Sequence, residues 1–457
     1  MSKTEVTLDK LSSLAKRRGF IYQGSEVYGG LSGTWDYGPL GLKLKKNIEN
    51  LWWRTFVDER HDMYGVDAAI LMNQKVWQAS GHMETFTDPL VECGNCKARF
   101  REDHLNSEVC PVCGKADSMG ESRQFNMMFE TTIGPVNPRT TFVEKSKSSS
   151  GEVEQKISFK ELPTSLVYLR PETAQGIFTN YKNVVDSFYP DLPFGIAQIG
   201  KAFRNEISPR DFVFRSREFN QMEIEYFIRE DNWEAEFATW QSDIKDFLIK
   251  QLGLDSDKLH EEDVVGDELA HYSKKTIDFN FDFPHGSDEL LGLAYRTNFD
   301  LKNIQDNSGK SMEYRVKGSD DSFIPHVIEP SFGLERALMA VLTSAYREDE
   351  VEGKTRTYLA LPEHLAPIRY AVSPLLKNKP ELVDKAREVY KLLHDKHPGR
   401  VMWDDSGNIG KRYRRQDEIG TPECVVIDFE TIEDDGKVTV RNRDTTRQKR
   451  TLPEKLD

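Results

Sequence analysis

Two short segments rich in arginine and glutamate restrict the fold of this chain more than any other feature of the sequence. The first is Phe203-Arg-Asn-Glu206, and the second, after ten intervening residues, is Arg217-Glu-Phe-Asn-Gln-Met-Glu223. Apolar and polar residues alternate around both segments, which predicts β-strands. Ser208-Pro-Arg-Asp211 between them is typical of a turn. We therefore expect an antiparallel hairpin.

The second predicted strand has two different faces, because successive side chains of a strand point to opposite sides. One face carries Arg217, Phe219, Gln221, Glu223 and Glu225, and the other carries Met222, Ile224, Tyr226 and Ile228. Arginine forks match phosphate oxygens in pairs, and an aromatic ring beside them can stack on a base. A salt-bridged, half-exposed surface sheet would show the same alternation. The pattern alone leaves both interpretations open.

A third segment, Glu329-Pro-Ser-Phe-Gly-Leu-Glu-Arg336, precedes the apolar run Ala337-Leu-Met-Ala-Val-Leu342. We expect Pro330 to open a helix there, since the first turn is a favoured position for proline. Gly333 would let the backbone approach a ligand closely. Arg336 would lie in the first turn, where the helix dipole favours anions. A buried helix with a capping acidic residue is the alternative.

Four of the five cysteines form two pairs, Cys93-x-x-Cys96 and Cys110-x-x-Cys113, with thirteen residues between the pairs. This spacing is close to that of structural zinc sites. It predicts one tetrahedral Zn²⁺ with a structural role. The alternative is four reduced thiols in a lobe without metal. Cys424 lies in an apolar strand and is expected to be a buried spectator.

Length and composition set the remaining limits. A chain of 457 residues suggests about two to four domains. No run approaches the ~18 apolar residues of a membrane span. The first residues lack an apolar secretory core, so we expect a cytoplasmic protein without a membrane partner. The net charge of −14 argues against nonspecific binding to nucleic acid, although Lys411-Arg-Tyr-Arg-Arg415 is locally basic.

Periodicity also predicts how the chain is organised. Helices are expected over Thr7 to Arg18, from Pro39 onward and from about Trp233 to Leu254, and Ile70-Leu-Met72 resembles a strand. Beyond a polar stretch near 350–362, strands and helices alternate as in a compact α/β domain. We divide the chain into a first domain, 1–361, and a second, 362–457. Within the first we expect a cysteine-rich insert at 88–120, a flexible insertion at 139–160 and a mostly helical insertion at 230–275.

The hairpin and the Gly-Leu-Glu-Arg segment resemble motifs 2 and 3 of the class II aminoacyl-tRNA synthetases. Four further segments narrow the resemblance to the family of homodimeric glycyl-tRNA synthetases: Trp35-Asp-Tyr-Gly-Pro-Leu-Gly41, Leu169-Arg-Pro-Glu-Thr-Ala-Gln-Gly-Ile177, Leu269-Ala-His-Tyr-Ser273 and Pro325-His-Val-Ile-Glu-Pro-Ser331. The resemblance implies an α+β fold. It would combine a class II catalytic domain (an antiparallel sheet flanked by helices), a small four-cysteine insert of the zinc type and a C-terminal α/β anticodon-binding domain.

Members of this family activate glycine with ATP to give glycyl-adenylate and then transfer glycine to the 3′ end of tRNA(Gly). The resemblance implies that Arg204 holds the α-phosphate and the glycine carboxylate, and that Phe219 and Arg336 cover the two sides of the adenine. Arg204 and Arg336 are thus the implied catalytic residues. The implied ATP-binding residues are Arg204, Asn205, Glu206, Phe214, Arg215, Ser216, Arg217, Glu218, Phe219, Glu289, Leu290, Gly333, Leu334, Glu335 and Arg336. Glu289 would act through Mg²⁺.

The resemblance also implies a glycine site in which carboxylates receive the ammonium group. Its residues are Arg101, Glu172, Phe219, Asn220, Gln221, Met222, Glu223, Glu329, Pro330, Ser331, Phe332 and Gly333. Because glycine has no smaller rival, a pocket that refuses any side chain can select it, and we expect no editing domain. The implied partners are ATP, glycine, tRNA(Gly) and a second copy of the chain. Asn408 to Pro422 matches the anticodon-binding domain and could contact tRNA phosphates and bases.

Two other functions are alternatives to that of a glycyl-tRNA synthetase. A synthetase for another small amino acid, or a paralogue that passes the adenylate elsewhere, would keep the fold but change the substrate. A non-catalytic binding protein would keep the fold without the reaction. Such synthetase-like proteins typically lose the arginines of motifs 2 and 3, whereas Arg204, Arg217 and Arg336 are all present here.

Overall fold

The computed structural model describes residues 6–105, 109–134, 166–266, 269–270 and 272–456. The insertion expected at 139–160 therefore lies outside the described residues. In the part of the chain described, no helix is both long and apolar enough to cross a membrane.

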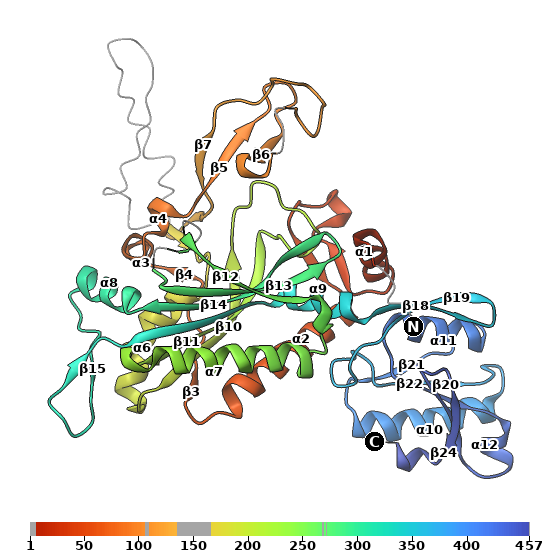
Figure 1. Cartoon of the computed structure of the whole chain (residues 1–457). Coiled ribbons are helices and arrows are strands. Elements are labelled where there is room, and N and C mark those ends of the chain that lie inside the picture. Colours follow the sequence, from red (N-terminus) through yellow and green to blue (C-terminus); the bar gives the residue numbers. More distant parts are fainter. Residues whose placement is uncertain (1–5, 106–108, 135–165, 267–268, 271, 457) are drawn as a thin grey trace.

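A seven-stranded mixed sheet forms the centre of the larger part of the molecule (Figure 1). Its order is β12-β13-β14-β17-β11-β10-β3, and all neighbours are antiparallel except β10 and β3. The strands are β3 (Met63–Gly65), β10 (Phe194–Phe203), β11 (Glu218–Ile228), β12 (Leu259–Val264), β13 (Lys275–Phe283), β14 (Gly286–Thr297) and β17 (His326–Gly333).

Helices bury both faces of this sheet. On one face, Met222, Ile224 and Tyr226 of β11 belong to the largest apolar cluster. That cluster includes residues of α1 (Leu8–Arg17), α2 (Pro39–Trp53), α7 (Trp233–Asp246) and α9 (Leu334–Ala345). On the other face, Phe227 packs with α6 (Ala174–Phe188) and α8 (Phe299–Ser308). The alternation predicted for the second strand is confirmed.

The predicted helices begin where local chemistry favours them. The Thr7 hydroxyl caps α1 by accepting a hydrogen bond from the Lys10 N–H at 3.3 Å. Pro39 occupies the first turn of α2, as expected. Both α2 and α7 continue into π-helical turns, Arg54–Asp58 and Phe247–Gln251.

One local prediction is wrong, and two others hold with different bounds or an added strand. Pro330 does not open a helix: it lies within β17 opposite Leu293 of β14, and α9 begins at Leu334. Pairing on both sides overrides the local preference, and because proline has no N–H, the ladder to β11 is interrupted there. The segment 230–275 contains α7, but it also contains β12, an edge strand of the main sheet. The strand expected at 70–72 is only β4 (Leu71–Met72), in a separate small sheet with β9 (Leu166–Leu169) and β8 (Phe129–Thr132).

The cysteine-rich insert is a small three-stranded sheet of order β6-β5-β7. Its strands are β5 (Thr87–Glu92), β6 (Arg99–Arg101) and β7 (Arg123–Asn126), so it extends past the expected limit of 120. In Figure 1 this sheet projects from the top of the main sheet. It brings one edge residue, Arg101, toward the central site described below.

The C-terminal part has its own apolar core and a five-stranded sheet of order β21-β20-β22-β23-β24. Its elements are β20 (Tyr370–Pro374), α10 (Pro380–Lys396), β21 (Val401–Trp403), α11 (Ile409–Glu418), β22 (Glu423–Ile427), α12 (Phe429–Glu433), β23 (Val438–Asn442) and β24 (Gln448–Thr451). This is the expected α/β pattern. Leu365 and Ile368 pack in the larger core, whereas Tyr370 packs in the C-terminal one. The change of core thus falls slightly after 362.

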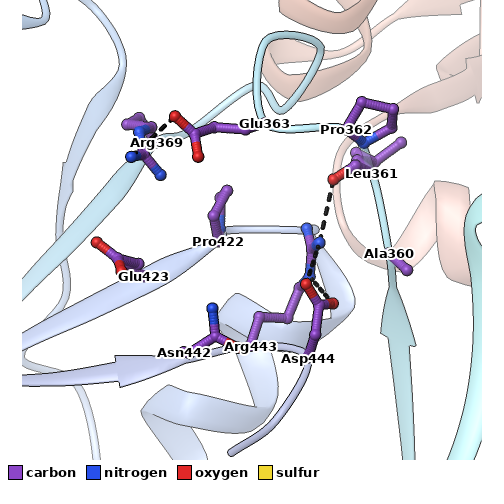
Figure 2. Close-up of a pocket in the computed structure, with 10 residues that line it drawn as sticks. All are labelled: Ala360, Leu361, Pro362, Glu363, Arg369, Pro422, Glu423, Asn442, Arg443 and Asp444. Atoms are coloured by element: carbon purple, nitrogen blue, oxygen red, sulfur yellow. Dashed lines mark hydrogen bonds and ion pairs between the residues drawn. The ribbon is translucent and has the colours of Figure 1, made fainter. Parts of the chain in front are cut away.

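The hairpin β18 (Tyr346–Val351) and β19 (Lys354–Leu359) joins the two parts (Figure 1). A cavity of about 380 Å³ lies at this junction, and Figure 2 shows its lining. Its two arginines are already bound: Arg369 pairs with Glu363 at 2.8 Å, and Arg443 donates to the Leu361 carbonyl at 3.0 Å. None of the residues predicted for ATP, glycine or metal lines this cavity.

Candidate active site

The predicted hairpin forms and places its charged residues at the mouth of a cleft. β10 and β11 pair antiparallel from Phe194–Phe227 to Phe203–Glu218. Just beyond the strand ends, the Arg204 N–H donates to the Arg217 carbonyl at 2.9 Å. Glu223 and Glu225, on the polar face of β11, are 2% and 0% exposed. Because this face is buried, the surface-sheet interpretation is wrong.

The cleft has a volume of about 280 Å³ and collects residues from separate parts of the sequence. It is lined by Arg101, Met127, Arg204, Glu206, Phe214, Arg215, Ser216, Phe219, Gln221, Glu289, Leu290, Ser331, Gly333, Glu335 and Arg336. All of these except Met127 belong to the sets predicted for ATP or glycine. The contribution of Met127 carried no signal in the sequence, because it depends on where the segment between β7 and β8 lies in the folded chain.

Two arginine–aromatic pairs lie in the cleft. The Arg204 guanidinium is 5.2 Å from the centre of the Phe219 ring, and its Nε donates to the Pro171 carbonyl at 3.1 Å. The Arg336 guanidinium is 4.5 Å from the centre of the Phe214 ring. Arg336 Nη1 also donates to Glu289 Oε2 at 3.0 Å and to the Glu289 carbonyl at 2.8 Å. The cleft thus offers cationic groups and ring faces together, which suits a nucleotide.

Several predicted residues do not line the cleft. Arg217 donates from Nη1 to the Ser32 carbonyl at 2.6 Å and from Nη2 to the Glu206 carbonyl at 3.0 Å, so it holds the loops around the cleft. The Asn205 N–H donates to the Met127 carbonyl at 2.7 Å. The side chains of Met222, Phe332 and Leu334 are in the apolar core, and Glu218 pairs with Lys201.

Met222, Phe332, Leu334 and Glu218 therefore do not present their side chains to the cleft, and their assignment to ATP or glycine stays a prediction. For Met222, Phe332 and Glu218 the physical reason is the two-residue period of a strand, since every second residue faces away from the site. Leu334 begins α9 and packs into the core. Asn220 of β11 and Pro330 of β17 likewise lie one residue away from the residues that face the cleft, so they belong to the other side of their strands. The Asn220 side chain accepts a hydrogen bond from Lys45 Nζ at 3.0 Å.

Lys45 of α2 ties two of the predicted motifs together beside the cleft. Its Nζ donates to Glu335 Oε1 at 2.8 Å, and Glu335 Oε2 accepts from the Asn220 N–H at 2.7 Å. Lys45 is 9% exposed and Glu335 is 5% exposed. Glu335 immediately precedes Arg336 in the first turn of α9. Lys45 could not be selected from the sequence, because a single lysine on an amphipathic helix gives no signal.

A second, acidic compartment adjoins the cleft and contains the three glutamates predicted for glycine. Glu172 lies 3.2 Å from His82 Nε2 of α4 (His82–Thr85). Glu223 accepts a hydrogen bond from the Ser331 hydroxyl at 2.8 Å and another from the Thr173 hydroxyl. Ser331, like Gln221, also lines the cleft. The compartment therefore meets the cleft at these two residues.

Arg296 is the cation of this acidic compartment, and sequence reasoning missed it. Its Nη1 donates to Glu329 Oε1 at 2.8 Å and Oε2 at 3.0 Å, and its Nε and Nη2 bind Asp300 at 2.8 and 2.9 Å. Arg296 is 2% exposed, and its guanidinium is 3.8 Å from the centre of the Tyr272 ring. Nothing in the local sequence Tyr295-Arg-Thr-Asn298 distinguishes this arginine from others on a strand. Asp300, two residues beyond Asn298, supplies a carboxylate that holds Arg296.

The electrostatics of the acidic compartment differ from residue to residue. Burial would raise the pKa of Glu172, but His82, Arg296 and Arg204 outweigh it and lower the pKa to about 2. Burial, with the charge of Glu172, raises the pKa of Glu223. Burial likewise raises the pKa of Glu329 to about 8, although Arg296 opposes the shift. Negative charge is thus held most firmly at Glu172.

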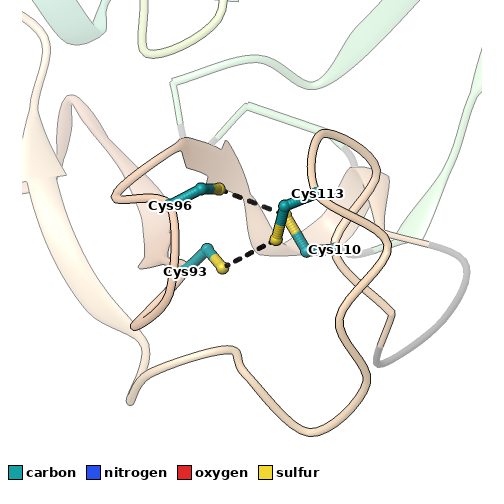
Figure 3. Close-up of side chains that lie close together, drawn as sticks. All are labelled: Cys93, Cys96, Cys110 and Cys113. Atoms are coloured by element: carbon teal, nitrogen blue, oxygen red, sulfur yellow. Dashed lines mark hydrogen bonds between the residues drawn. The ribbon is translucent and has the colours of Figure 1, made fainter.

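The four paired cysteines of the insert converge, as their spacing predicts (Figure 3). Cys93 Sγ lies 3.8 Å from Cys113 Sγ, and Cys96 Sγ lies 3.6 Å from Cys110 Sγ. All four sulfurs lie within 4.8 Å of one another. A tetrahedral ion with sulfur ligands at about 2.3 Å requires sulfurs about 3.8 Å apart, so the set fits one zinc ion. Cys424 is separate and buried, as expected.

The basic run 411–415 lies in α11, and Arg412 and Arg415 are bound to other groups of the protein. Arg412 is 3% exposed and donates to the carbonyl of Pro374 at 2.5 Å and to that of Gly407 at 2.9 Å. Arg415 pairs with Asp404 at 2.6 Å. These contacts dock the helix on its own domain. A role of Arg412 in contacting tRNA phosphates does not fit its burial.

Comparison with known families finds a matching family for each of the two parts of the molecule. Residues 159–345 match the family described as "tRNA synthetase class II core domain (G, H, P, S and T)", and residues 370–456 match "Anticodon binding domain". The prolyl-tRNA synthetase of Giardia lamblia, solved with prolyl-adenylate, superposes with a TM-score of 0.67 at 15% identity. The superposition covers 99% of this chain and 75% of that one. The fold is thus that of a class II aminoacyl-tRNA synthetase.

Nearly full-length relatives narrow this class. A glycine–tRNA ligase from Caldanaerobacter subterraneus subsp. tengcongensis is 44% identical, over 99% of this chain and 97% of that protein. One from Geobacillus kaustophilus is 45% identical, over 97% and 96% respectively. The chain belongs to the family of glycine–tRNA ligases.

Proposed function

We propose that this chain activates glycine with ATP to form glycyl-adenylate and then transfers glycine to the 3′-terminal adenosine of tRNA(Gly). One observation carries the proposal: the cleft with its two arginine–aromatic pairs meets, at Gln221 and Ser331, a buried compartment of carboxylates. A nucleotide and a small ammonium-bearing substrate would thus meet at this boundary. The family membership of the chain points to the same reaction.

In the first step, an oxygen of the glycine carboxylate attacks the α-phosphorus of ATP, and the bond to the bridging oxygen breaks to release pyrophosphate. Arg204 would bind the α-phosphate and the incoming carboxylate, which are both negative, and so reduce their repulsion. Phe219 and Arg336 would hold the adenine between them. Arg336 would release Glu289 and bind phosphate oxygens of ATP instead. The reaction needs no covalent bond between substrate and protein.

Glycine would be selected by charge and by size. Its ammonium group would be held by Glu172 and by the hydroxyl-supported Glu223, with Glu329 beside them. The buried side chains around these groups would leave no room for a Cβ substituent, and selection by exclusion is effective for the smallest amino acid. In the second step the terminal ribose hydroxyl of tRNA attacks the carbonyl carbon, and AMP leaves.

Two kinds of metal ion fit the residues present. The side chain of Glu289 is 43% exposed and lines the cleft, which suits a Mg²⁺ ion that is held by one carboxylate and by the phosphates of ATP. Such an ion would neutralise charge on the phosphates. The four cysteines would hold one structural Zn²⁺ ion and keep Arg101 in place through the small sheet. Arg101 is also bound to Asp88 at 2.9 Å.

The C-terminal part would bind the anticodon loop of tRNA(Gly), and the active form would be a homodimer. We base the first role on the match to anticodon-binding domains. The second rests on the family resemblance. Light scattering of the purified protein tests the dimer, because a monomeric mass with full activity would contradict it.

Amino-acid-dependent exchange of pyrophosphate into ATP tests the proposed function. The protein is incubated with Mg²⁺ and each amino acid in turn, without tRNA. We expect exchange with glycine alone. Exchange with a different amino acid would leave the fold unchanged but assign another substrate. No exchange with any amino acid, from folded protein, would favour a non-catalytic binding protein.

A further inference from the structure

Glu225 is a buried acid in the glycine compartment that no part of the proposed reaction uses. It lies on β11 two residues beyond Glu223, on the same face, and is 0% exposed. Neither of its carboxylate oxygens has a hydrogen-bond partner among the residues that the structure describes. Carboxylate oxygens of Glu223, Glu225 and Glu329 lie within 4.8 Å of one another. An acid in such a place needs an explanation.

The neighbours of Glu225 differ from it because each has its own partners. Glu329 is bound by Arg296 at both oxygens, 2.8 and 3.0 Å away. Glu223 accepts hydrogen bonds from the hydroxyls of Ser331 and Thr173. The remaining nitrogens of Arg296 are bound to Asp300. All three nitrogens of Arg296 are therefore bound to residues other than Glu225.

The charges around Glu225 disfavour its ionised form. The groups that act on it are Glu329, Glu223 and Asp300, which are acidic, and Arg296, which is the one cation among them. A buried, unpaired carboxylate beside two others is costly, and such a group takes up a proton instead. Burial, and then the charge of Glu329, raise the pKa of Glu225 well above its ordinary value.

We propose that Glu225 is protonated at neutral pH and donates its O–H to a neighbouring carboxylate, so that it positions the acids that receive the ammonium group of glycine. Once Glu225 is neutral, it adds no negative charge beside Glu223 and Glu329, and Arg296 keeps its two bonds to Glu329. The compartment then holds fewer negative charges than its acids suggest. Glu225 is thus a positioning residue, and this inference rests on the proposed function.

Glycine kinetics of three variants test this inference. E225Q keeps the shape and the donor of a neutral acid, so we expect its KM for glycine in pyrophosphate exchange to stay within about threefold of the parent value. E223Q is the matched control on the same strand face. It removes a charge that receives the ammonium group, and we expect its KM to rise at least about 30-fold. E225D should also impair binding, because the shorter side chain cannot reach the neighbouring acid.

An infrared difference spectrum supplies a readout that a merely structural residue would not affect. At pH 7, without glycine, the difference spectrum between the parent protein and E225Q should show the carbonyl stretch of a protonated carboxylic acid, because E225Q lacks the band of Glu225 but keeps any band of Glu329. That band should disappear as the pH is raised. The spectrum does not depend on activity, so it distinguishes failure of this inference from failure of the proposed function.

Three results would overturn the inference. The first is a rise in the KM of E225Q for glycine as large as that of E223Q. The second is the absence of the protonated-acid band from the difference spectrum between the parent protein and E225Q. The third is loss of folding in E225Q under conditions where E225D folds, because a neutral, isosteric amide should be tolerated at a site that holds a neutral acid.

Discussion

The buried pair between Lys45 and Glu335 gives the most specific prediction for the catalytic domain. Lys45→Met keeps most of the length and the apolar stem of the side chain but removes the ammonium group, which lies 2.8 Å from Glu335 Oε1. Glu335, 5% exposed, would then lose its cationic partner and keep the Asn220 N–H. Breaking one side of a buried ion pair costs about 3–5 kcal/mol, because it leaves an uncompensated charge.

The pair also supports the nucleotide site, since Glu335 precedes Arg336 on α9. We expect Lys45→Met to lower the urea midpoint of the catalytic domain and to raise the KM for ATP about tenfold in glycine-dependent pyrophosphate exchange. The double variant Lys45→Met/Glu335→Gln leaves no buried charge unpaired, and the amide oxygen can still accept from the Asn220 N–H. It should therefore be less destabilised than Lys45→Met alone, and its KM for ATP should recover.

Unfolding of the parent, the two single variants and the double variant by urea, followed by tryptophan fluorescence, measures the stability part of this prediction. Trp52 and Trp53 lie at the end of the same helix as Lys45. If the losses of the two single variants simply added in the double variant, the two side chains would act independently. That result would contradict an energetic coupling between Lys45 and Glu335.

Three further predictions concern the proposed chemistry. Arg204→Ala should lower kcat for glycine-dependent exchange about 10²–10³-fold, because it removes one preorganised contact to the α-phosphate; an unchanged rate would contradict its role. Metal analysis of freshly purified protein should find one zinc per chain, and Cys110→Ser should lose it and lower the melting temperature of the insert. Glu172 has a pKa lowered to about 2, so its stabilising effect is present above its unfolded pKa of about 4.3 and is lost as the pH falls through about 2. Glu172→Gln should therefore be less stable than the parent at pH 7 but converge with it in acid, and an equal difference at every pH would contradict this.

Local sequence patterns determined much of the fold. The two-residue alternation in the second strand correctly assigned Met222 and Ile224 to the core and Glu223 and Glu225 to the opposite face. The cysteine spacing correctly predicted that four sulfurs converge. These predictions succeed because the information lies within a few neighbouring residues: the period of a strand or a helix, and the reach of a Cys-x-x-Cys turn.

Whole-motif resemblance was less precise about individual side chains. It assigned Met222 and Phe332 to the glycine site because they lie inside matching segments, but alternate residues of those strands face the core. The preference of proline for the first turn of a helix was also misleading at Pro330. Pairing with β14 places this residue within a strand and not at the start of a helix. A motif match identifies a stretch of backbone, and the pleat of the sheet then decides which of its side chains can reach a ligand.

Local patterns in the chain thus specify the strands and helices, the four-cysteine insert and the segments that build the cleft. Which charges meet depends on how the folded chain packs. Arg296 binds Glu329 across two strands, Lys45 reaches Glu335 from another helix, and Glu225 has no hydrogen-bond partner among the described residues beside them. Each of these depends on residues far apart in the chain and on their burial. No local pattern records such pairings, because the energy of a charge is set by what surrounds it in space.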